Sequence, residues 1–221
     1  MLLQLLELAG ATVTMDAMHC QVEAAQAILD RDADYILSAK DNQPTLHKYL
    51  QEKFVSCNEE DAKVPGLTQH ITRERSHGRQ ELRHYYTLPA TAADQKVLSR
   101  WPGLKSFTMV YRQRTIGEQE SSEIAYFISI HAPIVRALAG HIRGHWSTEN
   151  SQHHVLDVTF AEDASRIRKR SAPEISSAIR RMSLNILQLD TTVKDNIRGK
   201  RLRAGWDEQV LERMWSAFCR G

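Results

Sequence analysis

The hydrophobic period changes twice along this chain, and the order of those changes constrains the fold more than any other feature. Residues 9–17 and 34–39 are short apolar runs typical of buried strands, and they flank a helical pattern at residues 20–31. A second helical pattern follows at residues 45–54. Because a strand, a helix and a strand in this order close as a parallel pair with a right-handed crossover, we predict an α/β arrangement here.

Between residues 67 and 130 the helical period gives way to alternation of apolar and polar side chains. The alternating runs lie at residues 68–75, 80–88, 106–116 and 122–130. They predict a mostly antiparallel sheet inserted into the α/β region. Helical patterns return at about residue 134, and the clearest one opens at Pro173. We expect its buried side to carry Ile175, Ala178, Ile179, Met182, Leu184, Ile186 and Leu187.

The composition is that of an ordinary globular protein. The 221 residues suffice for one domain or two small ones, and 42% hydrophobic with 25% charged residues permits a packed core. Three cysteines at unrelated spacings argue against a disulfide framework and fit a reducing cytosol. The apolar start lacks the basic region of a signal peptide, and no apolar run is long enough to span a membrane.

The charge is distributed unevenly. The whole chain carries a net charge of +2, but residues 166–203 hold eleven Lys and Arg against three acidic residues, which is a net charge of +8. The remainder of the chain must then sum to −6. This asymmetry points modestly to a polyanionic partner for the basic segment.

Asp16 is the first candidate for chemistry. It ends a predicted buried strand, at the place where open α/β sheets bind ligands, and a carboxylate oxygen there can hold a divalent metal. The alternative is an N-cap for the following helix, and the local sequence by itself favours the cap.

A second candidate is a helical segment rich in histidine. His141, His145, Glu149 and His153 are four positions apart, so they share one face of a helix. They could form a zinc site, although the HExxH spacing and a CxxC pair are both absent. Glu149 could instead share a metal with Asp16. The plainest alternative is a half-buried helix with Trp146 in the core and Glu149 on the surface.

Two polar clusters carry groups that contact phosphates in other proteins. Ser165 lies beside Arg166, Arg168 and Lys169, a combination suited to a DNA backbone, although a charge run is usually a solvated face. His77 and Arg79 lie at a predicted turn into a strand. They could grip a DNA backbone or simply form the surface of a hairpin.

Taken together, several segments match one family in order and register. They are VTMDAMHCQ, DYILSAKDNQPTLH, SHGRQELRHY, WPGLKS, IRGHWSTENSQHHVLDVTFAEDASRIRK, APE, LNIL and GKRLRAGWD. Over nearly its whole length the chain resembles the H-repeat-associated transposases, a branch of the bacterial insertion-sequence transposases of the DDE superfamily. The most specific motifs are HWxxEN and the LDVTFxEDxSRIR that follows it.

The resemblance implies the fold, which is α/β: the C-terminal portion of an RNase H-like domain with an inserted, mostly antiparallel β region and a helical C-terminal tail. Residues 1–64 would be a partial RNase H-like core. Residues 65–131 would be the β-rich insertion. Residues 132–221 would be a helical part with the final catalytic glutamate and the basic segment.

The resemblance also implies a catalytic site of three carboxylates, Asp, Asp and Glu, that hold two Mg²⁺ or Mn²⁺ ions. By motif position Asp16 matches the second carboxylate, Glu149 the third, and Asn150 the residue after it. In related families a Tyr-xx-Arg-xxx-Glu pattern surrounds this glutamate, and its first two positions are Ile142 and His145 here. The strand with the first carboxylate precedes Met1 in the family, so the sequence predicts a truncated chain.

The resemblance implies DNA transposition by metal-dependent phosphodiester hydrolysis and strand transfer, with transposon ends and target as the double-stranded DNA partners. The candidate DNA-contacting residues are Lys40, Asn42, His77, Arg79, His145, Asn150, Arg166, Arg168 and Lys169. Two alternatives stay open: a catalytically inactive DNA-binding remnant, and a zinc-dependent hydrolase. We expect a bacterial cytoplasmic, nucleoid-associated protein with no membrane partner, and the sequence leaves open a homo-oligomer.

Overall fold

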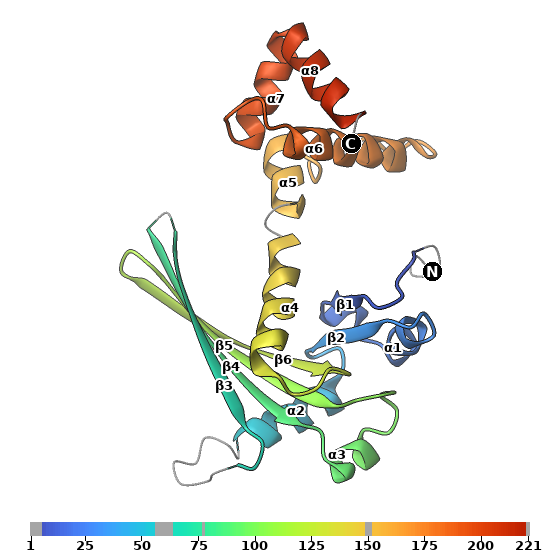
Figure 1. Ribbon diagram of the computed structural model, residues 1–221, viewed down its shortest axis with the longest axis vertical. Helices are drawn as coiled ribbons and strands as arrows, with labels where there is room; N and C mark the ends of the chain where they lie inside the picture. The colour runs from blue at the N-terminus through green and yellow to red at the C-terminus, as the bar shows by residue number, and fades with distance from the viewer. Residues whose placement is uncertain (1–5, 56–63, 77, 149–151, 220–221) are drawn as a thin grey trace. The chain divides into compact units, whose positions relative to one another are not determined.

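The structure is a computed structural model that describes residues 6–55, 64–76, 78–148 and 152–219. The chain forms two compact units, residues 1–145 and residues 146–221. We call them the sheet unit and the helical unit. The described residues comprise six β-strands and eight α-helices, so the class is mixed α/β as the sequence predicts (Figure 1). None of the helices in the described ranges is long and apolar enough to cross a membrane.

One continuous sheet organises the sheet unit. Its strands are β1 (Thr12–Met15), β2 (Asp34–Ala39), β3 (Thr68–Ser76), β4 (Arg79–Pro89), β5 (Ser106–Ile116) and β6 (Gln119–Ser129). In space the order is β1-β2-β6-β5-β4-β3. β1 and β2 are parallel, as the crossover argument predicts, and all other neighbours are antiparallel. The predicted antiparallel strands therefore extend the α/β sheet through the β2–β6 pairing.

Helices cover this sheet on both faces. Those of the sheet unit are α1 (Val22–Leu29), α2 (Pro44–Val55), α3 (Ala92–Val97) and α4 (Val135–Thr148), with a short 3₁₀-helix η2 (Ala17–His19) after β1. Side chains alternate between the faces of a strand. Val13 and Met15 pack with the core formed by α1 and α2, whereas Thr12 and Thr14 contact histidines on the α4 side.

The core of the sheet unit lies between the sheet and helices α1 and α2. Tyr35, Leu50 and Phe107 have no exposed surface there, and Trp101 is 3% exposed. Trp101 lies directly before the turn at Pro102 and Gly103 and belongs to this core. Helix α3, which the hydrophobic pattern does not predict, begins with a reciprocal cap between Thr91 and the buried Asp94.

The helical unit contains α5 (His154–Phe160), α6 (Ala172–Leu189), α7 (Ile197–Trp206) and α8 (Glu208–Phe218). Its small core includes Ile186, Leu187, Val193, Val210 and Met214. The predicted buried side of α6 is correct only at its C-terminal end. There Leu184, Ile186 and Leu187 are buried, but three predicted members, Ile175, Ile179 and Met182, are exposed by 41–59%. The period identified an apolar stripe, but packing partners cover only its last turns.

Candidate active site

Asp16 follows the last residue of β1 directly and opens η2, at the carboxyl end of the parallel strand pair. Its side chain is exposed, and its backbone has the extended conformation of an N-cap residue (φ −74°, ψ 176°). The side chain nevertheless makes no capping hydrogen bond to the described residues of η2. Asp16 therefore occupies the N-cap position of η2, as the alternative predicts, but its carboxylate makes no capping hydrogen bond to the described residues.

The loop after β2 lies beside the loop after β1, because parallel strands end at the same edge of a sheet. The side-chain amide of Asn42 donates a hydrogen bond to the main-chain oxygen of Ala17. The amide of Gln43 donates to the main-chain oxygen of Cys20 at 2.9 Å. Lys40 lies at the start of the same loop, and its Nζ is 3.8 Å from the carboxylate of Glu123.

Two histidines form hydrogen bonds with the face of β1 that points away from helices α1 and α2. Thr14 Oγ1 is hydrogen-bonded to His145 Nδ1 at 3.0 Å, which joins β1 to the last turns of α4. Thr12 Oγ1 makes the corresponding bond to His131 Nε2, also at 3.0 Å. The ring of His131 stacks on that of His141, with 5.1 Å between the ring centroids.

The environment of His131 favours its neutral form. Burial lowers the pKa of His131, and the nearby His141 and Lys105 lower it further. Asp34, whose carboxylate is 3.6 Å from Nδ1, acts in the opposite direction without overcoming burial. A neutral imidazole can donate or accept a hydrogen bond, so it can bind the Thr12 hydroxyl. A neutral ring also stacks on His141 without repulsion between two positive charges.

Glu149 and Asn150 lie outside the described residues, so the predicted approach of Glu149 to Asp16 stays a prediction. Helix α4 ends at Thr148, directly before Glu149 in the sequence. The alternative of a zinc site has no support in the described ranges, which contain no group of three or more His, Cys, Asp or Glu side chains able to hold a metal.

A network of ion pairs lies at the far ends of β3 and β4. Arg143 of α4 forms a two-pronged bond with Glu74, from Nε at 2.9 Å and from Nη2 at 2.8 Å. Glu74 also lies 3.2 Å from Arg83, which pairs with the buried Glu81. The hydrogen bonds from Arg143 lower the pKa of Glu74, although burial acts against them. Helix α4 is therefore tied to the hairpin as well as to β1.

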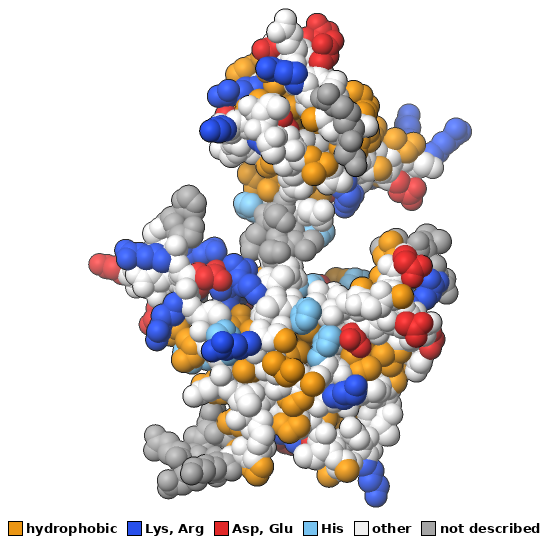
Figure 2. Space-filling view, in the orientation of Figure 1, with side chains coloured by type: hydrophobic (Ala, Val, Ile, Leu, Met, Phe, Trp, Pro, Cys, Tyr) orange, Lys and Arg blue, Asp and Glu red, His pale blue; other side chains and the backbone are white. Residues whose placement is uncertain are grey.

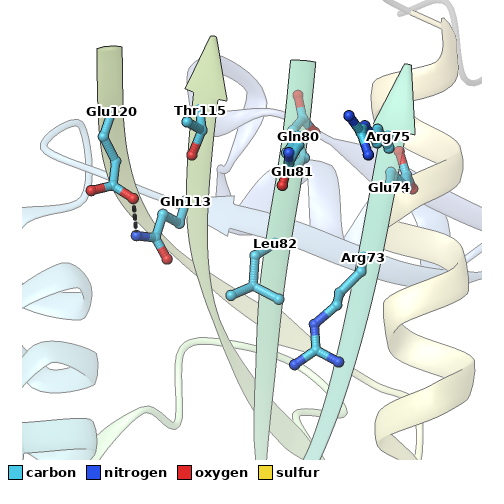
Figure 3. Close-up of a pocket in the computed structure, with 9 residues that line it drawn as sticks. All are labelled: Arg73, Glu74, Arg75, Gln80, Glu81, Leu82, Gln113, Thr115 and Glu120. Carbon is cyan, nitrogen blue, oxygen red and sulfur yellow. Dashed lines mark hydrogen bonds between the residues drawn. The ribbon is translucent and has the colours of Figure 1, made fainter. Parts of the chain in front are cut away.

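Of the two turn candidates, only Arg79 can be placed, and it belongs to this network. Arg79 Nε lies 3.1 Å from Glu81, and His77 is outside the described residues. Figure 3 shows the shallow pocket on the strands nearby, where the amide of Gln113 donates a hydrogen bond to Glu120. Its lining residues are Arg73, Glu74, Arg75, Gln80, Glu81, Leu82, Gln113, Thr115 and Glu120.

The basic segment divides into cations that bond within the protein and cations that do not. Arg168 donates to main-chain oxygens, Arg181 and Arg203 pair with Glu162 and Asp195, and Arg201 donates to the main-chain oxygen of Thr159. Lys200 is buried and binds the C-terminal end of α6. The cations without a hydrogen bond or ion pair to another described residue are Arg166, Lys169, Arg170, Arg180, Lys194 and Arg198. All six are exposed except Arg180, which is half-buried, and Figure 2 shows Lys and Arg at several places on the helical unit.

Sequence reasoning missed the side chains that hold α4 in place. Thr14 had one usable signal, because it lies two positions before Asp16 and must face the side of the sheet opposite Val13. Glu74 and Arg143 had none, because 69 positions separate them and each resembles an ordinary surface charge. Their pairing follows from the register of β3 and from the path of α4.

Comparison with known proteins agrees with this architecture. The model of the transposase DDE domain family matches residues 1–186. Putative transposase YncI of Escherichia coli O157:H7 is 37% identical over 96% of the chain and 54% of its own length. The H repeat-associated putative transposase YhhI of Escherichia coli K12 is 32% identical over 95% of the chain and 56% of its own length. No solved structure matches the chain significantly.

The chain therefore belongs to the DDE-domain transposase family, and the resemblance to H-repeat-associated transposases is confirmed. It spans about half the length of the curated relatives that it matches.

Proposed function

We propose that this chain forms part of an RNase H-like catalytic domain of a DDE transposase that acts on double-stranded DNA. The hydrogen bond between Thr14 and His145 carries the proposal. It joins β1, the strand directly before Asp16, to the helix that leads to Glu149, although 131 positions separate the two bonded residues. We expect the carboxyl groups of Asp16 and Glu149 to share one metal ion and to lie within about 4–6 Å of each other.

Asp16 fits the role of a ligand for a divalent cation. Its carboxylate is exposed, makes no capping hydrogen bond to the described residues, and stands at the edge where α/β sheets bind their ligands. Mg²⁺ and Mn²⁺ prefer oxygen donors of this kind. Bound in the family's site, two such ions supply activation of water or a 3′-hydroxyl and stabilisation of the leaving oxygen, which is the chemistry of phosphodiester hydrolysis and strand transfer.

Among the candidate DNA contacts, we favour exposed cations whose side chains bond to no other described residue. Arg166 and Lys169 are exposed and are the strongest candidates, since neither bonds to another described residue. Lys40 and Arg79 are ion-paired with Glu123 and Glu81, so a phosphate would compete with these carboxylates for them. Transposon ends and target DNA would be the substrates. A homo-oligomer and a place in the bacterial cytoplasm, near the nucleoid, belong to the same proposal.

Manganese binding tests the metal site directly. Free Mn²⁺ would be measured by electron paramagnetic resonance during titration of the 221-residue chain, of Asp16→Asn and of Glu149→Gln. We expect each substitution to weaken Mn²⁺ binding by about tenfold or more, because each removes a charged oxygen ligand. Asp163→Asn, an exposed aspartate in the helical unit, is the matched control. Equal affinities of Asp16→Asn and the control would overturn the metal site.

We also propose that the 221-residue chain does not cut DNA by itself. The resemblance matches only two of the three family carboxylates to this sequence, and two-metal chemistry needs ligands that fix both ions about the scissile phosphate. Incubation with supercoiled plasmid and Mg²⁺ or Mn²⁺ should leave the plasmid intact. Metal-dependent nicking that disappears in Asp16→Asn would contradict this, and it would show that another residue supplies the third ligand.

A DNA-binding chain without catalysis is the second candidate function, and it is favoured by the six cations of the basic segment that bond to no other described residue. It predicts salt-dependent binding to duplex DNA together with Mn²⁺ binding that Asp16→Asn leaves unchanged. The manganese titration therefore separates the two functions.

A further inference from the structure

Two amide side chains after β2 hold the main chain that follows Asp16. Asn42 Nδ2 donates to the main-chain oxygen of Ala17, the residue directly after Asp16. Gln43 Nε2 donates to the main-chain oxygen of Cys20 at 2.9 Å and to Oε1 of Gln21 at 3.2 Å. Ala17 is the first residue of η2, and Cys20 directly follows its last residue. The two amides therefore bind the main chain at both ends of the turn that follows Asp16.

The turn needs such partners because it is short. A 3₁₀-helix of three residues satisfies few of its own carbonyl groups. Within the turn, Cys20 N donates to the oxygen of Ala17 at 3.0 Å, and His19 N donates to the oxygen of Asp16 at 3.2 Å. The oxygen of Ala17 therefore has one partner from the turn and a second from Asn42.

The main chain of Gln43 is itself held by hydrogen bonds on both sides. Gln43 N donates to the oxygen of Lys40 at 2.9 Å, and its own oxygen accepts from His47 N at 2.8 Å, at the start of α2. Helix α2 is anchored in the core through Leu46 and Leu50. At the other end of the turn the side chain of Cys20 has no exposed surface. Two anchored segments thus meet at the main chain after Asp16.

We propose that Asn42 and Gln43 are positioning residues for Asp16. Their amides set the direction in which the Asp16 carboxylate leaves the sheet, and so the place where it can bind a divalent metal. The inference rests on the proposed role of Asp16 as a metal ligand. It gives Asn42 a role within the protein, where the sequence predicts a DNA contact.

Asn42→Asp separates positioning from simple electrostatics. The new side chain has nearly the same shape, but it loses both N–H donors and turns an acceptor oxygen toward the oxygen of Ala17. Its added negative charge, close to Asp16, would by itself strengthen cation binding. Loss of the turn geometry would weaken it. The two effects have opposite signs, so the direction of the change in Mn²⁺ affinity identifies the one that dominates.

The experiment combines two measurements on the 221-residue chain and on the variants Asn42→Asp and Gln43→Glu. Hydrogen exchange of residues 17–21 is followed without metal, and the Mn²⁺ dissociation constant is measured by paramagnetic resonance. We expect faster exchange in residues 17–21 and a roughly tenfold weaker Mn²⁺ affinity in each variant, the size that supporting residues of metal sites commonly show. Gln69→Glu, an exposed position on β3, is the matched control for the amide-to-acid change.

Each remaining outcome decides the inference. Unchanged or tighter Mn²⁺ binding in Asn42→Asp would overturn the positioning role, even if exchange became faster, because the amides would then only stabilise the turn. Unchanged hydrogen exchange in both variants would mean that the amides of Asn42 and Gln43 do not hold residues 17–21 in place. If Asp16→Asn leaves Mn²⁺ binding intact, the proposed metal site fails and the positioning role fails with it, whereas accelerated exchange would still establish that the amides hold the turn.

Discussion

Three carboxylates of the sheet unit and six cations of the helical unit differ in how their charges are paired. On the sheet, each of three carboxylates lies between two cations: Glu74 between Arg143 and Arg83, Glu81 between Arg83 and Arg79, and Glu123 between Arg112 and Lys40. In the helical unit, six cations of the basic segment bond to no other described residue.

Lys and Arg side chains can therefore serve two purposes in this protein, one in ion pairs within the sheet unit and the other in contacts to phosphate. Paired charges on the sheet limit how α4 and the hairpin can move, which suits a region that has to hold a carboxylate in place. The six cations form no ion pair with the described residues, so a phosphate backbone can bind them without displacing a carboxylate of the described ranges. The two units also differ in the size of their hydrophobic cores. An extensive buried cluster supports the sheet, and a small one supports the helices.

The largest expected effect comes from the cores. Phe107→Ala should destabilise the sheet unit by roughly 3–5 kcal/mol, because a fully buried ring leaves a cavity in a closely packed cluster. Met214→Ala in the helical unit should cost about 2 kcal/mol, since its smaller cluster can collapse more easily. Hydrogen exchange in urea, resolved by segment, would locate each loss. Equal acceleration in β2 and α8 by both variants would mean that the two units unfold as one.

A buried carboxylate gives the next largest effect. Burial alone would raise the pKa of Asp94, but bonds from Lys53, Tyr49 and Thr91 outweigh it and lower the pKa to about 2, below the ordinary value of 3.8. The group therefore contributes stability above pH 4, and this contribution is lost as the pH falls toward 2. Asp94→Asn should cost about 2 kcal/mol at pH 7.

The pH dependence provides the check on Asp94. Urea unfolding at several pH values should show the difference between the native chain and Asp94→Asn shrinking between pH 4 and pH 2. The exposed Asp163→Asn should change stability by less than about 0.5 kcal/mol at every pH. A difference for Asp94→Asn that stays constant down to pH 2 would contradict the lowered pKa and would indicate a packing effect instead.

The unpaired cations should produce the smallest change in free energy and the clearest change in salt dependence. Replacing Arg166, Lys169 and Arg170 together by Gln should weaken binding to duplex DNA by about tenfold. It should also reduce the slope of log K against log salt by roughly 2–3. Fluorescence anisotropy with a labelled duplex at several salt concentrations would measure both quantities.

A matched triple variant of the sheet unit tests whether location matters. Lys48, Lys96 and Lys105 are exposed, and their replacement by Gln changes the net charge by the same amount. We expect it to leave the slope nearly unchanged. Equal losses in the two triple variants would mean that net charge alone attracts DNA and that the basic segment has no special role.

The sequence was most informative where one period dominates a segment. The apolar run at residues 34–39 coincides with β2, and the alternating run at 106–116 coincides with β5, because strands buried between partners keep a strict pattern. It was less informative on α6, where Ile175 and Ile179 share the apolar stripe but remain exposed. A period shows which residues share a face, and it does not show which part of that face is covered.

The same limit applies to the candidate site. Motif order and local pattern were sufficient to single out Asp16 at a strand end, the parallel pair behind it and the helix that leads to Glu149. The sequence by itself could not show that the Asp16 carboxylate makes no capping hydrogen bond to the described residues of η2, or that Asn42 donates to the Ala17 carbonyl. It also could not show that Thr14 forms a hydrogen bond with His145, or that Glu74 pairs with Arg143. Patterns along a sequence record which face a residue occupies, whereas a hydrogen bond needs two atoms about 3 Å apart, and only strand register and helix placement bring distant atoms that close.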